Sequence, residues 1–128
     1  MIARSLVTLG LLFAVGCGAA LPDAAAARER ANGLRTELNV IGDDVRDLYV
    51  SARALCELDV PEVREPCSAL EMAGPRINDG FDAAALVIDG AELGAATFEQ
   101  ARSALDVARE LAAEALRLAE GVRANVAP

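Results

Sequence analysis

The stretch ARERANGLRTELNVIGDDVRDLYVSARAL, residues 27–55, decides the fold. Its apolar residues recur at alternating steps of four and three, and this heptad spacing places them on one face of an α-helix. They are Ala27, Ala31, Leu34, Leu38, Ile41, Val45, Leu48, Ala52 and Leu55. The pattern predicts one helix from Asp23 to Leu58, with Pro22 and Asp23 suited to its first turn and a length of about 50 Å. We expect the charged residues of the opposite face to be solvated: Arg28, Glu29, Arg35, Asp43, Arg46, Asp47 and Arg53.

A second helix is predicted to begin directly after this one. Asp59 suits its cap, Pro61 its first turn and Glu62 the capping-box position. A second heptad seam follows at Val63, Cys67, Leu70, Gly74, Ile77, Phe81, Ala84 and Ile88. Pro75 is expected to kink or interrupt this helix, because proline lacks the N–H and crowds the carbonyl four residues earlier. Gly90 is a natural stop.

A third helix is predicted after a connector at residues 91–96. Thr97 to Gln100 read as a capping box that opens it. Its apolar face comprises Phe98, Ala101, Leu105, Ala108, Leu111, Ala112, Ala115, Leu118, Ala119 and Val122. We therefore expect an all-α, three-helix antiparallel bundle over residues 23–128, built from a long helical hairpin and a third helix. Alanine-rich seams predict a thin core, which makes self-association or a covering partner helix plausible.

The N-terminal residues have the features of a secretory signal. One arginine, Arg4, precedes an apolar run that is shorter than the roughly 20 residues needed to span a bilayer. The run ends in Ala14-Val15-Gly16-Cys17, which resembles the lipobox of bacterial lipoproteins. The resemblance covers residues 1–18 and implies a signal peptide at 1–16, lipidation of Cys17 and a lipidated tether at 17–22. An alternative is cleavage after Ala20, which would also export the chain.

The cellular location that this resemblance implies is the bacterial cell envelope. The chain would then reach the membrane through its N-terminal lipid, and more than one acyl chain would make that anchoring stable. In the sorting rule of these lipoproteins, Asp after the cysteine favours retention in the inner membrane. Gly18 stands there instead, so the periplasmic face of the outer membrane is the expected location.

The chain that remains after residue 16 is strongly acidic. It contains eleven arginines, no lysine or histidine, and twenty carboxylates, which gives a net charge of −9. Such a charge repels phosphate backbones, and the only aromatic residues after residue 16 are Tyr49, Phe81 and Phe98. We therefore expect no nucleic-acid partner.

The ends of the first two helices bring Cys56 and Cys67 opposite each other. Export would favour oxidation, and a disulfide closing a loop of about a dozen residues would contribute about 3 kcal/mol. The alternatives are two unpaired thiols, or a redox or metal-binding pair. The spacing is not CxxC, and the sequence has no histidine to complete a metal site.

Four carboxylates surround this predicted disulfide: Glu57, Asp59, Glu62 and Glu65. Only Arg64 opposes them. They could form a docking site for a basic partner or a weak Ca²⁺ site, or they could be capping and solvated carboxylates of a loop.

No pattern in the sequence indicates catalysis. Without histidine there is no Ser-His or Cys-His pair, and no Glu-x-x-His motif for a di-iron bundle. We expect no catalytic residues, no cofactor and no bound metal. The sequence predicts a lipid-anchored periplasmic envelope protein with a non-catalytic binding or scaffolding role. One alternative is a secreted or anchored inhibitor or exclusion factor that blocks a basic protein. Another is an enzyme or metal carrier, because a helical bundle can hold a site that no motif reveals.

Overall fold

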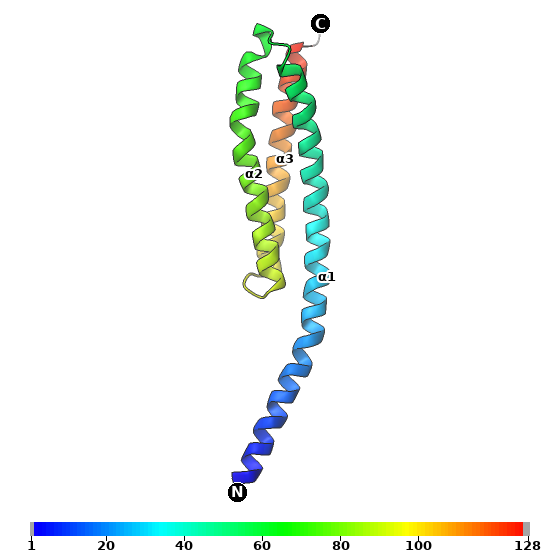
Figure 1. Cartoon of the computed structure of the whole chain (residues 1–128), viewed down its shortest axis with the longest axis vertical. Coiled ribbons are helices and arrows are strands. Elements are labelled where there is room, and N and C mark those ends of the chain that lie inside the picture. Colours follow the sequence, from blue (N-terminus) through cyan, green and yellow to red (C-terminus); the bar gives the residue numbers. More distant parts are fainter. Residues whose placement is uncertain (1, 127–128) are drawn as a thin grey trace.

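The chain folds into an antiparallel three-helix bundle. The computed structural model describes the backbone of residues 2–126 and the side chains of residues 23–126. In this part of the chain lie the helices α1 (Ile2–Cys56), α2 (Arg64–Glu92) and α3 (Phe98–Val126), with a 3₁₀ helix, η1 (Pro61–Val63), before α2. α1 and α3 run in the same direction, and α2 runs opposite to both (Figure 1). The all-α fold and three-helix architecture that the sequence predicts are confirmed.

The first helix is longer than predicted at one end and shorter at the other. α1 begins at Ile2, so Asp23 lies inside the helix and does not start it. The alanines at positions 24–27 are strong helix formers and allow the helix to continue through this region. α1 ends at Cys56 and not at Leu58. It stops there because Asp59 adopts a left-handed conformation with φ 48°, and the last turn tightens through bonds such as Asp59 N–H to the Cys56 carbonyl, 3.3 Å.

The start of the second helix differs from the predicted cap. Pro61 begins η1, as its place in a first turn predicts, but Asp59 is not the cap. The residue before η1 is Val60, and no side chain makes a capping hydrogen bond there. A capping side chain belongs to the extended residue directly before the helix, whereas Asp59 is one residue too early and left-handed.

Pro75 does not interrupt α2. The helix passes through Pro75 and continues beyond Gly90 to Glu92. In the turn before Pro75, the Tyr49 hydroxyl of α1 donates a hydrogen bond of 3.1 Å to the Leu70 carbonyl. This contact supplies a partner next to the site where proline disturbs the helical hydrogen bonds.

The connector between α2 and α3 is residues 93–97, so it begins two residues later and ends one residue later than predicted. Gly94, with φ 78°, takes the left-handed conformation that ends a helix, so the turn forms there and not at Gly90. The capping box of α3 is confirmed. Thr97 N–H donates to Gln100 Oε1 at 2.9 Å, and Gln100 N–H donates to Thr97 Oγ1 at 3.0 Å.

The core is narrow and half of it is alanine. Eighteen apolar residues are buried, nine of them alanines, and among the residues whose side chains are described no polar or charged one is buried. Over residues 31–52 of α1 every seventh residue is buried: Ala31, Leu38, Val45 and Ala52. The intervening seam residues, such as Leu34 and Leu48, are only half-buried. Small side chains give each helix little apolar area to bury, so grooves remain open between the helices.

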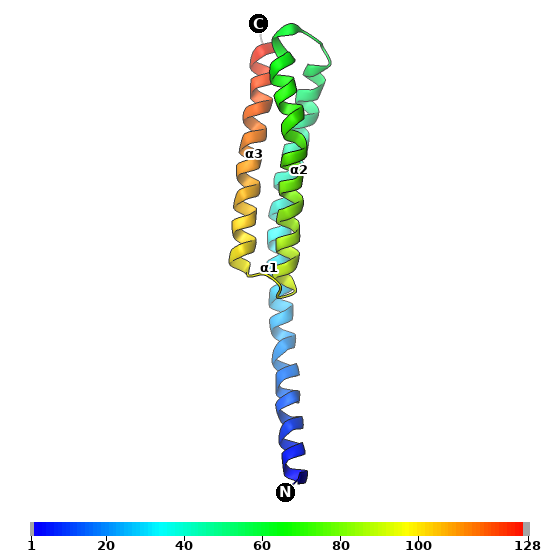
Figure 2. The same ribbon diagram turned by 90° about the vertical axis from the view of Figure 1, so that its left-hand side faces the viewer.

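The bundle has two distinct ends, the tip and the connector end. The tip is the end where α1 turns into α2, residues 56–67, and the C-terminal end of α3 lies beside it (Figure 1). The connector end is the opposite end, where α2 joins α3. α1 extends past the connector end toward the N-terminus, as both views show (Figure 2).

Candidate functional site

A disulfide joins the first two helices at the tip. Cys56 and Cys67 have Cα atoms 5.9 Å apart and are bonded in the structure, as the sequence predicts. Cys67 is buried and packs in a cluster with Val63, Leu70 and Val122. The disulfide therefore attaches the end of α1 to the buried apolar cluster that contains Cys67.

The four acidic residues predicted as a partner-binding site all lie at this tip and are all exposed. Glu62 is in the first turn of η1 and Glu65 in the first turn of α2, where carboxylates interact favourably with a helix N-terminus. Arg64 Nε lies 4.0 Å from Asp59 Oδ1, the outer limit of an ion pair between two exposed groups. The tip thus presents negative charge to solvent with little internal compensation.

The geometry gives no support to a calcium site at the tip. Among the side chains that the structure describes, no three Asp, Glu, Cys or His residues are grouped so that they could hold a metal ion. Calcium needs six to eight oxygen ligands around one point. The carboxylates of the tip are not grouped in this way.

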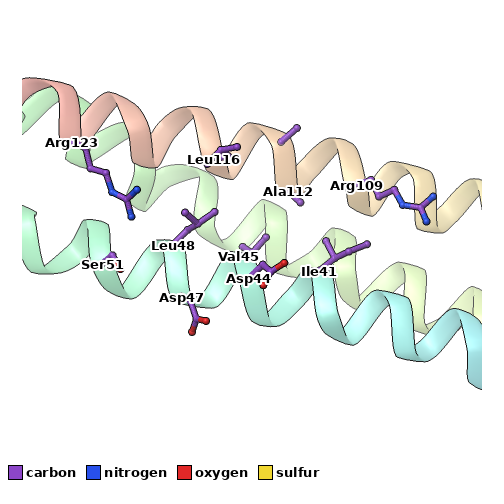
Figure 3. Close-up of a pocket in the computed structure, with 11 residues that line it drawn as sticks. Ile41, Asp44, Val45, Asp47, Leu48, Ser51, Arg109, Ala112, Leu116 and Arg123 are labelled. Atoms are coloured by element: carbon purple, nitrogen blue, oxygen red, sulfur yellow. The ribbon is translucent and has the colours of Figure 1, made fainter.

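A second candidate surface is a groove of about 600 Å³ between α1 and α3. Its floor is apolar, with Ile41, Val45 and Leu48 of α1 facing Leu116 of α3 (Figure 3). Arg123 extends from α3 into the space between the helices, whereas Asp47 points away from α3 (Figure 3). Leu116 is 41% exposed, so this part of the bundle leaves apolar surface uncovered.

A third candidate surface is a larger groove of about 850 Å³ between α1 and α2. Tyr49 and Phe81 line it, and charged residues stand on both of its edges. Removal of Tyr49 from water raises the pKa of its phenol above the ordinary value, and Glu114 adds to the shift. The phenol therefore stays protonated and acts as the donor to the Leu70 carbonyl.

Ion pairs between helices are a feature that the sequence pattern did not predict. Arg35 was expected on the solvated face, yet its guanidinium bonds Asp89 at 2.8 Å and also bonds Glu92. Arg28 Nε lies 3.7 Å from the same Glu92. The prediction that Arg35 is solvated is wrong because it assumes that α1 contacts other helices along one face only. In a three-helix bundle each helix contacts neighbours on two sides.

A further pair links α2 to α3 near the middle of the bundle. Arg76 donates a hydrogen bond to Glu114. This bond is the main reason why the pKa of the Glu114 carboxyl lies below its usual value, and nearby Arg117 adds to the effect. All these pairs lie at the surface and link neighbouring helices.

The predicted lipidation site is not tested by the structure. Cys17 and the predicted tether, residues 17–22, lie outside the residues whose side chains are described. Within the described part of the chain, none of the helices is sufficiently long and apolar to pass through a membrane. Comparison of the chain with protein families, with curated proteins and with solved structures found no match.

Proposed function

We propose that this chain is a lipid-anchored protein of the bacterial cell envelope that acts by binding or scaffolding and not by catalysis. The observation that carries the proposal is the disulfide between Cys56 and Cys67. Such bonds persist in oxidising compartments outside the cytosol. An exported location is also what the lipobox-like sequence at Ala14 to Cys17 implies, so two separate features of the chain support the same address.

The arrangement of α1 supports a role for the tip as the contact site. Cys17 and Cys56 belong to the same helix, and at 1.5 Å per residue they are separated by about 60 Å along its axis. An acyl chain on Cys17 would hold the opposite end of the molecule far from the membrane. The tip, with Glu57, Asp59, Glu62 and Glu65, is then the most accessible part of the molecule for a basic envelope protein.

Labelling with palmitate tests the anchor. The full chain, expressed in an export-competent bacterium, should incorporate labelled palmitate, and Cys17→Ala should abolish the label. A chain with Cys56→Ala and Cys67→Ala should keep it, which controls for the loss of a cysteine. Undiminished labelling of Cys17→Ala would contradict the anchor.

Capture from an envelope extract tests the tip. Glu57→Gln, Asp59→Asn, Glu62→Gln and Glu65→Gln together should remove any partner that binds wild type at low salt and is released at about 0.5 M salt, where screening is strong. A control chain should retain that partner. It has the same change in charge on the exposed face of α3: Glu99→Gln, Asp106→Asn, Glu110→Gln and Glu120→Gln. If the tip variant and the control capture the partner equally, the tip is not its binding site.

A further inference from the structure

The groove between α1 and α2 has edges of opposite charge. Its charged residues are Arg46 and Arg53 with Asp43 on α1, and Glu71, Asp79 and Asp82 on α2. Arg46 pairs with Asp43 of its own helix, at 3.5 Å. Among the described side chains, the remaining four make no ion pair across the groove. A basic edge and an acidic edge therefore lie open, separated by the width of the groove.

The groove between these edges is apolar at its base. A Cβ on Gly42 would lie 3.8 Å from the Phe81 ring, and one on Gly74 would lie 3.5 Å from the Tyr49 ring, so the two aromatic rings pack against bare backbone. Val50 is 64% exposed, and its helical position aligns it with Arg46 and Arg53. An occupant of this groove would cover apolar surface and meet both charged edges.

We propose that the occupant is a second copy of this chain, related to the first by a two-fold axis parallel to the bundle. Such an axis sets α1 of each copy against α2 of the other. Because the axis is parallel to the bundle, the two copies of any residue lie at the same height along it. Within one chain, Tyr49 is level with Leu70 and Gly42 with Phe81. By the same register, Arg53 of one copy faces Glu71 of the other, and Arg46 faces Asp79.

The charges favour this arrangement because one surface supplies both halves of the contact. In an isologous dimer every contact occurs twice, so the basic edge of each copy meets the acidic edge of its partner copy. Complementary edges oppose the general repulsion between two acidic chains. The axis also leaves both N-terminal extensions of α1 at the same end, as two anchors in one membrane require. Only this last point rests on the proposed function, since the contact surface lies entirely between residues 38 and 85.

Paired charge reversals test the dimer in the full chain. Two copies with different affinity tags are expressed together, and recovery of the second tag with the first is measured. Arg53→Glu in both copies, or Glu71→Arg in both copies, should lower recovery by about tenfold or more, because like charges then meet twice. Arg53→Glu in one copy and Glu71→Arg in the other should restore recovery, because both contacts again join opposite charges.

Matched reversals on α3, Arg102→Glu and Glu110→Arg, change the net charge equally and should leave recovery at the wild-type level. Wild-type copies that do not co-purify would overturn the proposal. So would reversals without effect, or a mixed pair recovered as poorly as each single variant. Rescue by mixing also shows that both variants fold. The readout is independent of palmitate labelling, so failure of the dimer and failure of the anchor are distinguishable.

Discussion

The three helices are held together by different interactions at the two ends of the bundle. At the tip, a disulfide joins α1 to α2, and the buried cluster around it contains two alanines among six residues. At the connector end, five of the eight residues in the buried cluster are alanines. There the helices are joined by charged groups, with Arg35 bonded to Asp89 and Glu92, and the Arg30 guanidinium 5.7 Å from the centre of the Phe98 ring.

Because of this difference, the interactions that stabilise the two ends should respond differently to ionic strength. Electrostatic screening does not act on the burial of Leu70 or on the covalent bond at the tip, whereas it weakens the partly exposed ion pairs of the connector end. Under the proposed function, the end that carries the disulfide is the one presented to a partner.

Removal of a large buried side chain should have the largest effect, and it should be greater at the tip. Leu70 is fully buried and Leu105 is 2% exposed, so each Leu→Ala change leaves a cavity. We expect Leu70→Ala to lower the free energy of unfolding by about 4 kcal/mol and Leu105→Ala by about 3 kcal/mol. The smaller loss is expected for Leu105 because most of its buried neighbours are alanines, which make fewer contacts with the leucine side chain. Urea unfolding of both variants measures this, and a larger loss for Leu105→Ala would reverse the comparison.

Loss of the disulfide should have the next largest effect. The bond closes a loop with a sequence separation of 11 residues. Cys56→Ala with Cys67→Ala should therefore lower the free energy of unfolding by about 3 kcal/mol through the greater entropy of the unfolded chain. A reducing agent should bring wild type to the stability of the variant and leave the variant unchanged. Equal stability of wild type with and without reductant would show that the bond does not stabilise the tip.

The heptad pattern predicted the architecture because helix faces depend on periodicity alone. The seam from Ala31 to Ala52 and the cysteine pair at its end follow from spacing that any helix of this sequence must keep. Helix ends were predicted less well. Asp59 and Gly94 adopt left-handed conformations that depend on how the chain turns back, and such a choice is made by the tertiary contacts of the turn.

The surfaces between helices could not be derived from the sequence. To predict the pairing of Arg35 with Asp89, one must know which side of α1 contacts α2. The heptad seam shows only which face of α1 points toward the core. The groove with Arg53 on one edge and Glu71 on the other depends on the same rotation of the helices. The tip carboxylates were easier to place, because a short loop keeps neighbours in sequence close in space.

The capping box at the connector end should contribute a smaller amount. Thr97 Oγ1 accepts a hydrogen bond from Gln100 N–H at 3.0 Å, and Thr97→Ala removes that acceptor. We expect the free energy of unfolding to fall by about 1 kcal/mol. Thr36→Ala is the matched control, since the Thr36 hydroxyl bonds only the carbonyl of Asn32 within α1. A loss no larger than that of the control would show that the box does not hold the start of α3.

The smallest effect should come from Arg35, and its dependence on salt should distinguish the two ends. Arg35→Gln removes the ion pairs with Asp89 and Glu92 and should lower the thermal midpoint at low salt, with Arg102→Gln as a control of equal charge. At about 1 M salt the wild-type pairs are screened, so the difference between wild type and Arg35→Gln should almost vanish. The deficit of the disulfide variant should be the same at both salt concentrations. If Arg35→Gln keeps its deficit at high salt, packing of the arginine stem against α2 stabilises the connector end, and the charge does not.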